Sequence, residues 1–236
     1  MSNLTPHASE PSFHQLQCRY LSDTFQPPDD SLPELLFTNI TKLYFDPKQP
    51  EAYKQPDWFV VLGVKPLPLG HWWHSFLPWQ ESVNPLLVVE LLDSETYSED
   101  LGKTVPGSGH TPTKWDVYER ILKIPYYIVF EGETSRLDVF QLTGEEYKNS
   151  VIQDQRIWIP ELELGLGLWQ GSYQEINRTW LRWYNAEESW IVPVSNSVLG
   201  LVSSPEPSDE NQPAAASDQA VLAEKLKQLG LKTSKT

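Results

Sequence analysis

The chain has 236 residues, with 18 Lys and Arg against 32 Asp and Glu, so its formal net charge is −14. Hydrophobic residues make up 39% of it and aromatic residues 12%, which is enough to bury a core and excludes disorder throughout. A single cysteine, Cys18, excludes an intrachain disulfide framework and a cysteine-rich zinc module. The acidity argues against a passive nucleic-acid coat, but it leaves room for an enzyme with one small basic or metal-loaded site.

No apolar run approaches the roughly 18–20 residues of a membrane span, and the first residues lack the apolar region of a signal peptide. A cytoplasmic protein that does not engage a membrane is therefore the expectation. Residues 1–30 are polar and predict an arm laid over the surface. Residues 31–45 predict a helix, with Ser31 as its N-cap and a single apolar stripe.

The middle of the chain is dominated by strand signals. Residues 58–64 and 86–92 are short apolar runs with prolines beside them, and they predict central strands covered on both faces. An irregular strand is expected within 71–80 and a helix at 113–122, followed by strands at 126–130, 137–142, 180–184 and 190–194. The pattern predicts one α/β domain over 31–195, then a disordered linker at 196–220 and a short amphipathic helix and tail at 221–236.

Two carboxylates stand out against these strands. Glu90 interrupts the most apolar run, LLVVELL, and an unpaired buried charge costs several kcal/mol, so it needs a partner or a cation. From the residues alone, a structural ion pair or an exposed strand end explains it equally well. Asp57 opens the run at 58–64, where a turn is the ordinary alternative. If the two strands are neighbours, the carboxylates converge, and Mg²⁺, with Mn²⁺ as a substitute, is the natural cation between them.

A lysine completes this candidate site. Along the helix at 113–122, Lys114 is the only charge on the stripe formed with Val117, Tyr118, Ile121 and Leu122. The helix dipole disfavours a lysine in the first turn, although a snorkelling side chain is an equally good explanation. Two acids at strand ends and a lysine directed at them are typical of nucleases, in which the metal activates water and the lysine stabilises charge on the phosphate.

Four segments in a fixed order carry a resemblance to a known family: PDWFVVLGV (56–64), WQESVNPLLVVELLDSET (79–96), EDLGKT (99–104) and TKWDVYERILKIPYYIVFEG (113–132). In these segments the chain resembles the Uma-two family of proposed restriction endonucleases, which is abundant in cyanobacteria and belongs to the PD-(D/E)XK nuclease superfamily. Segments 156–171 and 223–231 are similar to cyanobacterial members as well.

The resemblance implies a restriction-endonuclease-like core, a mixed central β-sheet flanked by helices, here with extra C-terminal strands. It implies that Asp57 and Glu90 hold the metal and that the main-chain carbonyl of Leu91 completes the site. The lysine that the superfamily places two residues after the second acid is a leucine here. The family is similar in this respect and supplies a lysine from the following helix, where Lys114 is the matching position. For the additional N-terminal acid of the superfamily, Glu34 is the best candidate.

Three functions remain open from the sequence. The first is a Mg²⁺-dependent endonuclease that hydrolyses phosphodiester bonds of DNA, where cutting both strands of a duplex would favour a homodimer. The second is a catalytically silent nuclease-fold interaction module, because a net charge of −14 leaves few cations for DNA. Those expected near the site are Lys65, Lys103, Lys114, Arg120 and Lys123. The third is an acidic DNA mimic, which would leave Glu90 and Lys114 without a purpose.

Overall fold

The structure is a computed structural model that describes residues 11–28, 34–39, 41–49, 51–64, 74–92 and 111–194. The predicted linker at 196–220 and the predicted terminal helix at 221–236 lie outside the described residues. Within the part of the chain that the structure describes, none of the helices has the length and apolar character needed to cross a membrane.

The helices are α1 (Phe13–Thr24), α2 (Pro78–Glu81), α4 (Lys114–Asp116), the π-helix η1 (Val117–Ile121) and the 3-10 helix η2 (Pro160–Leu162). The strands are β1 (Leu35–Thr38), β2 (Lys42–Tyr44), β3 (Tyr53–Lys54), β4 (Trp58–Leu62), β5 (Ser75–Phe76), β6 (Leu87–Leu92), β7 (Tyr126–Glu131), β8 (Arg136–Thr143), β9 (Glu146–Asn149), β10 (Arg156–Ile159), β11 (Leu164–Tyr173) and β12 (Ile176–Tyr184).

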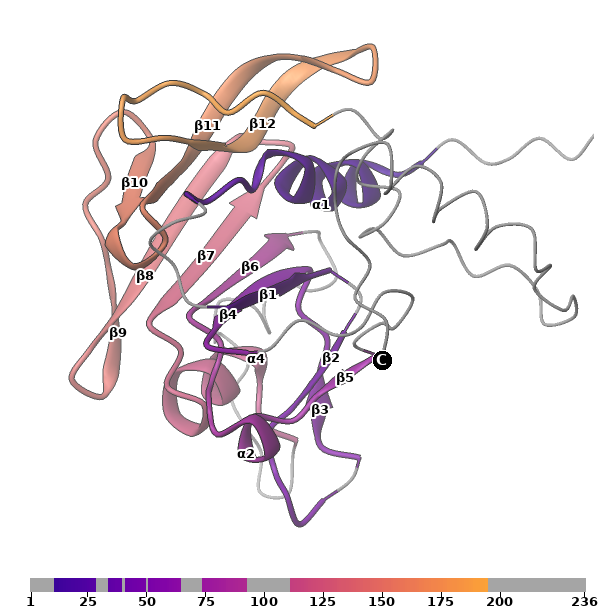
Figure 1. The fold of residues 1–236 in the computed structure, drawn as a ribbon, viewed down its shortest axis with the longest axis vertical. Helices are drawn as coiled ribbons and strands as arrows, with labels where there is room; N and C mark the ends of the chain where they lie inside the picture. The colour runs from indigo at the N-terminus through magenta and orange to yellow at the C-terminus, as the bar shows by residue number, and fades with distance from the viewer. Residues whose placement is uncertain are drawn as a thin grey trace, which may run out of the picture. The chain divides into compact units, whose positions relative to one another are not determined.

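A six-stranded mixed sheet forms the centre, in the order β1-β4-β6-β7-β8-β9 (Figure 1). Strands β6 and β7 are parallel, and the other neighbouring pairs are antiparallel. The two apolar runs become β4 and β6, which lie side by side with every residue of β6 buried. This confirms the predicted α/β class with a mixed sheet and the prediction that these strands are central.

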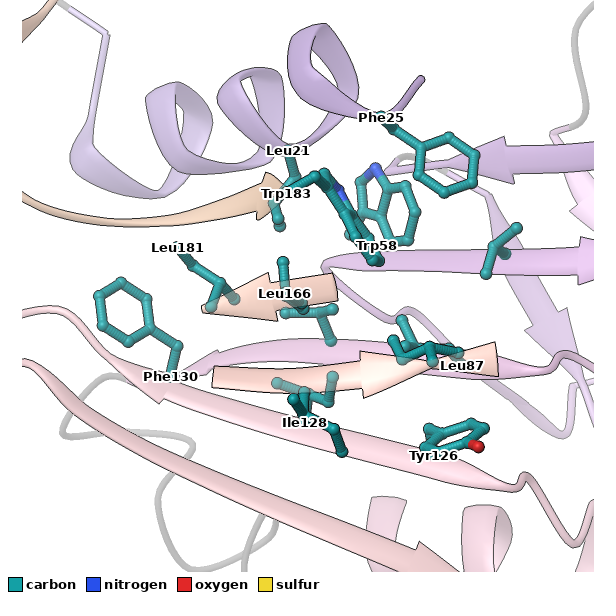
Figure 2. Close-up of a cluster of buried hydrophobic side chains, with 14 of the residues drawn as sticks. Leu21, Phe25, Trp58, Leu87, Tyr126, Ile128, Phe130, Leu166, Leu181 and Trp183 are labelled. Carbon is teal, nitrogen blue, oxygen red and sulfur yellow. The ribbon is translucent and has the colours of Figure 1, made fainter. Parts of the chain in front are cut away.

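The sheet separates two apolar layers, because successive strand residues point to opposite faces. One layer packs α1 and strands β10–β12 against the sheet, through side chains such as Leu21, Trp58, Ile128 and Trp183. Figure 2 shows these side chains filling the space between α1, β12 and the strands of the central sheet. The other layer places Tyr118 of η1 and the small sheet β3-β2-β5 on the opposite face.

The N-terminal helix α1 differs from the predicted surface arm. Ser12 caps the helix in a capping box with Gln15, and Leu16 and Leu21 on its inner side are buried. The polar composition concealed this helix because several of its buried residues are themselves polar. Gln17, for example, donates to the carbonyl oxygen of Leu181 at 2.8 Å and accepts from the amide of the same residue at 3.0 Å, so its burial is compensated.

The predicted helix at 31–45 is wrong: the described part of this range holds strands β1 and β2 instead. Strand β1 pairs with β4 along its whole length, from Leu35 opposite Leu62 to Thr38 opposite Phe59. A single apolar stripe cannot distinguish a helix from a short edge strand that pairs with a buried neighbour. Tertiary pairing therefore overrides the local helical pattern here.

The predicted helix at 113–122 is confirmed as α4 followed without a break by η1. Thr113 caps it in a capping box with Asp116, and the π-turn closes with Leu122 N–H donating to the Val117 carbonyl at 2.8 Å. This helical segment precedes β7 and packs on one face of the sheet through Val117 and Tyr118.

The extra C-terminal strands are present as a separate sheet, β10-β11-β12, which covers the α1 side of the central sheet. Trp180 and Trp183 of β12 are fully buried and belong to the core. A strand at 190–194 does not form; this segment makes only an isolated bridge, between Trp190 and Tyr184.

Candidate functional site

The pairing of β4 with β6 brings the two predicted carboxylates together. Trp58 lies opposite Val89 in this antiparallel pair. Asp57 precedes Trp58 and Glu90 follows Val89, so the two carboxylates meet at the same end of the two strands. The amide of Asp57 lies 3.4 Å from Glu90 Oε2. The sequence-based expectation that these carboxylates converge is therefore confirmed.

Glu90 is fully buried, and its charge is balanced by Lys114 from the crossover helix. Lys114 Nζ donates to Glu90 Oε2 at 2.9 Å, and the lysine side chain is only 13% exposed. Tyr118 OH, four residues further along, donates to Glu90 Oε1 at 2.8 Å. Residues four apart lie on one helix face. Both donors therefore reach Glu90 from the same face of the α4–η1 segment, and Lys114 points inward rather than snorkelling to water.

Asp57 is held by donors on both of its oxygens. His14 Nε2 lies 2.7 Å from Oδ1, and the amide of Leu91 donates to Oδ2 at 2.8 Å. Burial raises the pKa of Asp57, but the hydrogen bond and charge of His14 and the hydrogen bond from the Leu91 amide together lower it more. The net pKa lies below the ordinary value of 3.8, so Asp57 is a carboxylate near neutral pH.

The oxygen donors at this end of the sheet fit a hard divalent cation. A carboxylate offers about four lone-pair sites, so it can accept hydrogen bonds from the protein and also bind a cation. Among the described residues, no three His, Cys, Asp or Glu side chains are grouped to hold a metal ion. A metal would therefore use the carboxylates of Asp57 and Glu90 with the Leu91 carbonyl, which faces the same side of β6 as the Leu91 amide. Such an all-oxygen set with added water suits Mg²⁺.

Glu34 does not join this site. Its main-chain carbonyl accepts from Gly63 N–H at 2.6 Å, at the far end of β4 from Asp57. Gly63 is six residue steps from Asp57, which places the Glu34 main chain about 20 Å away along the strand. A helix at 31–45 would not have fixed the position of Glu34 relative to Asp57. The antiparallel β1–β4 pair does fix it, at the opposite end of β4. We therefore drop Glu34 from the candidate site.

Of the five basic residues expected near the site, Lys114 lies in it. Arg120 is within 3.3 Å of carboxylate oxygens of two neighbouring acids, and Lys123 is 3.3 Å from the carboxylate of Glu145. Lys65 and Lys103 lie outside the described residues. Among the described three, Lys114 is thus the cation directed at the carboxylate pair.

Sequence reasoning missed two residues that contact the carboxylates. Tyr118 lies on the inner stripe that the sequence predicts for its helix, but a phenol hydroxyl carries no signal of its partner. His14 was overlooked because its segment was taken for an arm. The pattern Ser-x-x-Gln at 12–15 is a capping-box signature and would have marked the start of α1.

The lowered pKa of Asp57 predicts a pH dependence of stability. A carboxyl group whose pKa is lower in the folded state stabilises the fold above its unfolded-state pKa, and this contribution is lost as the pH falls through the folded-state pKa. As the pH falls below the ordinary carboxyl pKa of 3.8, wild type should therefore lose more unfolding free energy than Asp57→Asn. Urea denaturation of both proteins across this range measures the difference. Parallel curves would contradict the charge-stabilised state of Asp57.

A mixed sheet with two acids at adjoining strand ends and a lysine from the crossover helix is consistent with a restriction-endonuclease-like fold and its nuclease superfamily. The family model described as "Putative restriction endonuclease", Uma2, matches residues 3–177. Because this match spans most of the chain, the protein belongs to the Uma2 family. The match begins before α1 and so includes the helix that carries His14. Comparison with curated proteins finds no match.

Proposed function

We propose that the protein is a Mg²⁺-dependent endonuclease that hydrolyses phosphodiester bonds of DNA. Membership of the Uma2 family supports a nuclease. The observation that carries the proposal is the burial of Glu90, with 0% exposure, beside Asp57 and within 2.9 Å of the Lys114 ammonium. A buried ion pair such as Glu90–Lys114 adds little stability over apolar residues of similar volume, so its presence beside a second carboxylate at a sheet end suits a cation-binding role.

The residues have distinct roles in this proposal. Asp57, Glu90 and the Leu91 carbonyl would hold Mg²⁺, which when bound would polarise the phosphate and make water a better nucleophile. Lys114 would stabilise negative charge that develops on the phosphate oxygens. In the hydrolysis, a bond forms between water oxygen and phosphorus as that water loses a proton to solvent, the bond from phosphorus to the leaving oxygen breaks, and solvent gives a proton to that oxygen.

Cleavage of a substrate panel tests the proposal. The panel holds supercoiled plasmid, linear duplex, single-stranded DNA, branched DNA and RNA, each with Mg²⁺ or Mn²⁺. Asp57→Asn and Glu90→Gln should each lower the rate by about 10²-fold or more, because each removes a charge that holds the cation. Glu146→Gln is the matched control, since Glu146 is exposed on β9, an edge strand of the central sheet that is separated from β6 by β7 and β8.

The outcomes are distinct. Cutting by wild type and by Glu146→Gln but not by the two site variants supports the proposal, and the panel then identifies the substrate class. Equal cutting by all four proteins would trace the activity to a contaminant or to another site. If wild type cut none of the substrates with either metal, the nuclease proposal would give way to the silent interaction module.

A further inference from the structure

Three residues on one face of α1 contact the start of β4. His14 Nε2 lies 2.7 Å from Asp57 Oδ1, and Cys18 Sγ donates to the Asp57 carbonyl at 3.3 Å. One turn later, Ser22 Oγ accepts a hydrogen bond from the indole of Trp58 at 3.1 Å. Residues four apart share a helix face, so the whole length of α1 is fixed against the segment that carries Asp57.

The N-terminal turn of α1, which holds His14, is itself anchored. Ser12 and Gln15 close its capping box. The ring of Phe13 packs against Phe130 of β7, and the Arg178 guanidinium lies over the same ring at 3.6 Å from its centroid. Since the residues on both sides of His14 are fixed, the imidazole is presented to Asp57 by rigid structure rather than by a loose chain end.

The consequence for Asp57 is a defined orientation. His14 contacts Oδ1, whereas the Leu91 amide donates to Oδ2, so the two donors restrain both ends of the carboxylate. An ionised carboxylate accepts only, which makes His14 Nε2 the donor. Carboxylates that bind metals are commonly oriented by such outer hydrogen bonds, whose loss weakens metal binding.

We propose that His14 is a positioning residue of the cation site, which holds Asp57 in the orientation that lets it bind a divalent cation together with Glu90. This inference rests on the proposed function. It assigns to α1 a direct part in the site, since the segment that sequence reasoning took for a surface arm supplies the donor that orients the first carboxylate.

The experiment measures Mn²⁺ binding directly, by the loss of the free-ion electron paramagnetic resonance signal, without DNA. The proteins are wild type, His14→Ala, His14→Gln, Asp57→Asn and the control His74→Ala, in which an exposed histidine at the start of β5 is removed. Thermal unfolding is followed in parallel. His14→Ala is expected to weaken Mn²⁺ binding by about 10–100-fold. His14→Gln should restore it to within a few-fold, because the glutamine amide can donate from a similar position.

Each result is decisive for one of the two proposals. The His14 inference is overturned if His14→Ala binds Mn²⁺ as wild type does, or if His14→Gln binds no better than His14→Ala, provided that Asp57→Asn has lost binding. If wild type binds no Mn²⁺, or if Asp57→Asn binds as tightly as wild type, the cation site itself fails, and with it the proposed function.

In the cleavage assay, His14→Ala should lower kcat and leave KM for DNA unchanged, since His14 orients Asp57 and need not touch the substrate.

Discussion

Replacing Glu90 with alanine should lower the free energy of unfolding by about 3–5 kcal/mol. The substitution removes the carboxylate that balances Lys114, whose ammonium lies 2.9 Å from Glu90 Oε2 in a side chain only 13% exposed. It also removes the acceptor of the Tyr118 hydroxyl. Chemical denaturation followed by circular dichroism measures the change.

Two variants give this measurement its controls. Glu146→Ala, at an exposed position of β9, should change stability by less than about 0.5 kcal/mol. The double variant Glu90→Gln/Lys114→Met removes both charges while keeping an acceptor for Tyr118, so it should recover much of the loss. If Glu90→Ala cost less than about 1 kcal/mol, the buried ion pair would not exist in the folded protein.

This first prediction affects how the site is tested. Alanine at position 90 removes activity in two ways, through the loss of a proposed metal ligand and through destabilisation of the sheet end. Glutamine keeps the length of the side chain and an oxygen for Tyr118 while removing the charge. A cleavage assay with Glu90→Gln therefore separates loss of the charge from loss of folded protein.

Replacing Trp58 with alanine should cost about 3–5 kcal/mol of unfolding free energy. The Trp58 side chain is fully buried, with its ring centroid 5.2 Å from that of Phe25 and 5.6 Å from that of Trp183. Its indole N–H also binds Ser22 of α1. Deleting it leaves a cavity between the central sheet, α1 and β12, all three of which Figure 2 shows around this side chain.

Trp158→Ala provides the matched comparison for that measurement. Trp158 lies on β10 and is 38% exposed, so its removal opens no enclosed cavity and should cost clearly less. Urea denaturation of the two variants in parallel gives both values. Equal losses would mean that the aromatic layer around Trp58 is not packed as the structure shows.

The sequence alone predicts the site residues that lie on the central strands and on the inner face of one helix. Glu90 stood out because a charge in an apolar strand conflicts with its surroundings, and Lys114 because it was the only charge on an inner helix face. If the apolar runs at 58–64 and 86–92 are neighbouring strands, the convergence of Asp57 with Glu90 follows. These are local patterns, and the β4–β6 register confirms the geometry that they implied.

The parts that sequence reasoning missed depend on contacts between distant segments. Gln17 is buried because the main chain at Leu181, 164 residues away, satisfies its amide. The hydrophobic stripe of 31–45 was read with a helical period, but pairing with β4 decided the outcome. His14 became part of the site only when α1 was placed against Asp57. In each case the local sequence carries no sign of the distant partner, and only the fold shows where that partner lies.

The docking of α1 between distant parts of the chain has a consequence for biosynthesis. A ribosome releases α1 first, yet the Gln17–Leu181 contact joins residues 164 positions apart, so the partner strand β12 is among the last described elements to emerge. Until then the side of α1 that packs against β12 has no native surface to cover it. The His14–Asp57 contact can form once β4 has emerged, but its support from β12 arrives only after all the intervening strands have been synthesised. Completion of the candidate site is therefore coupled to synthesis of nearly the whole described chain.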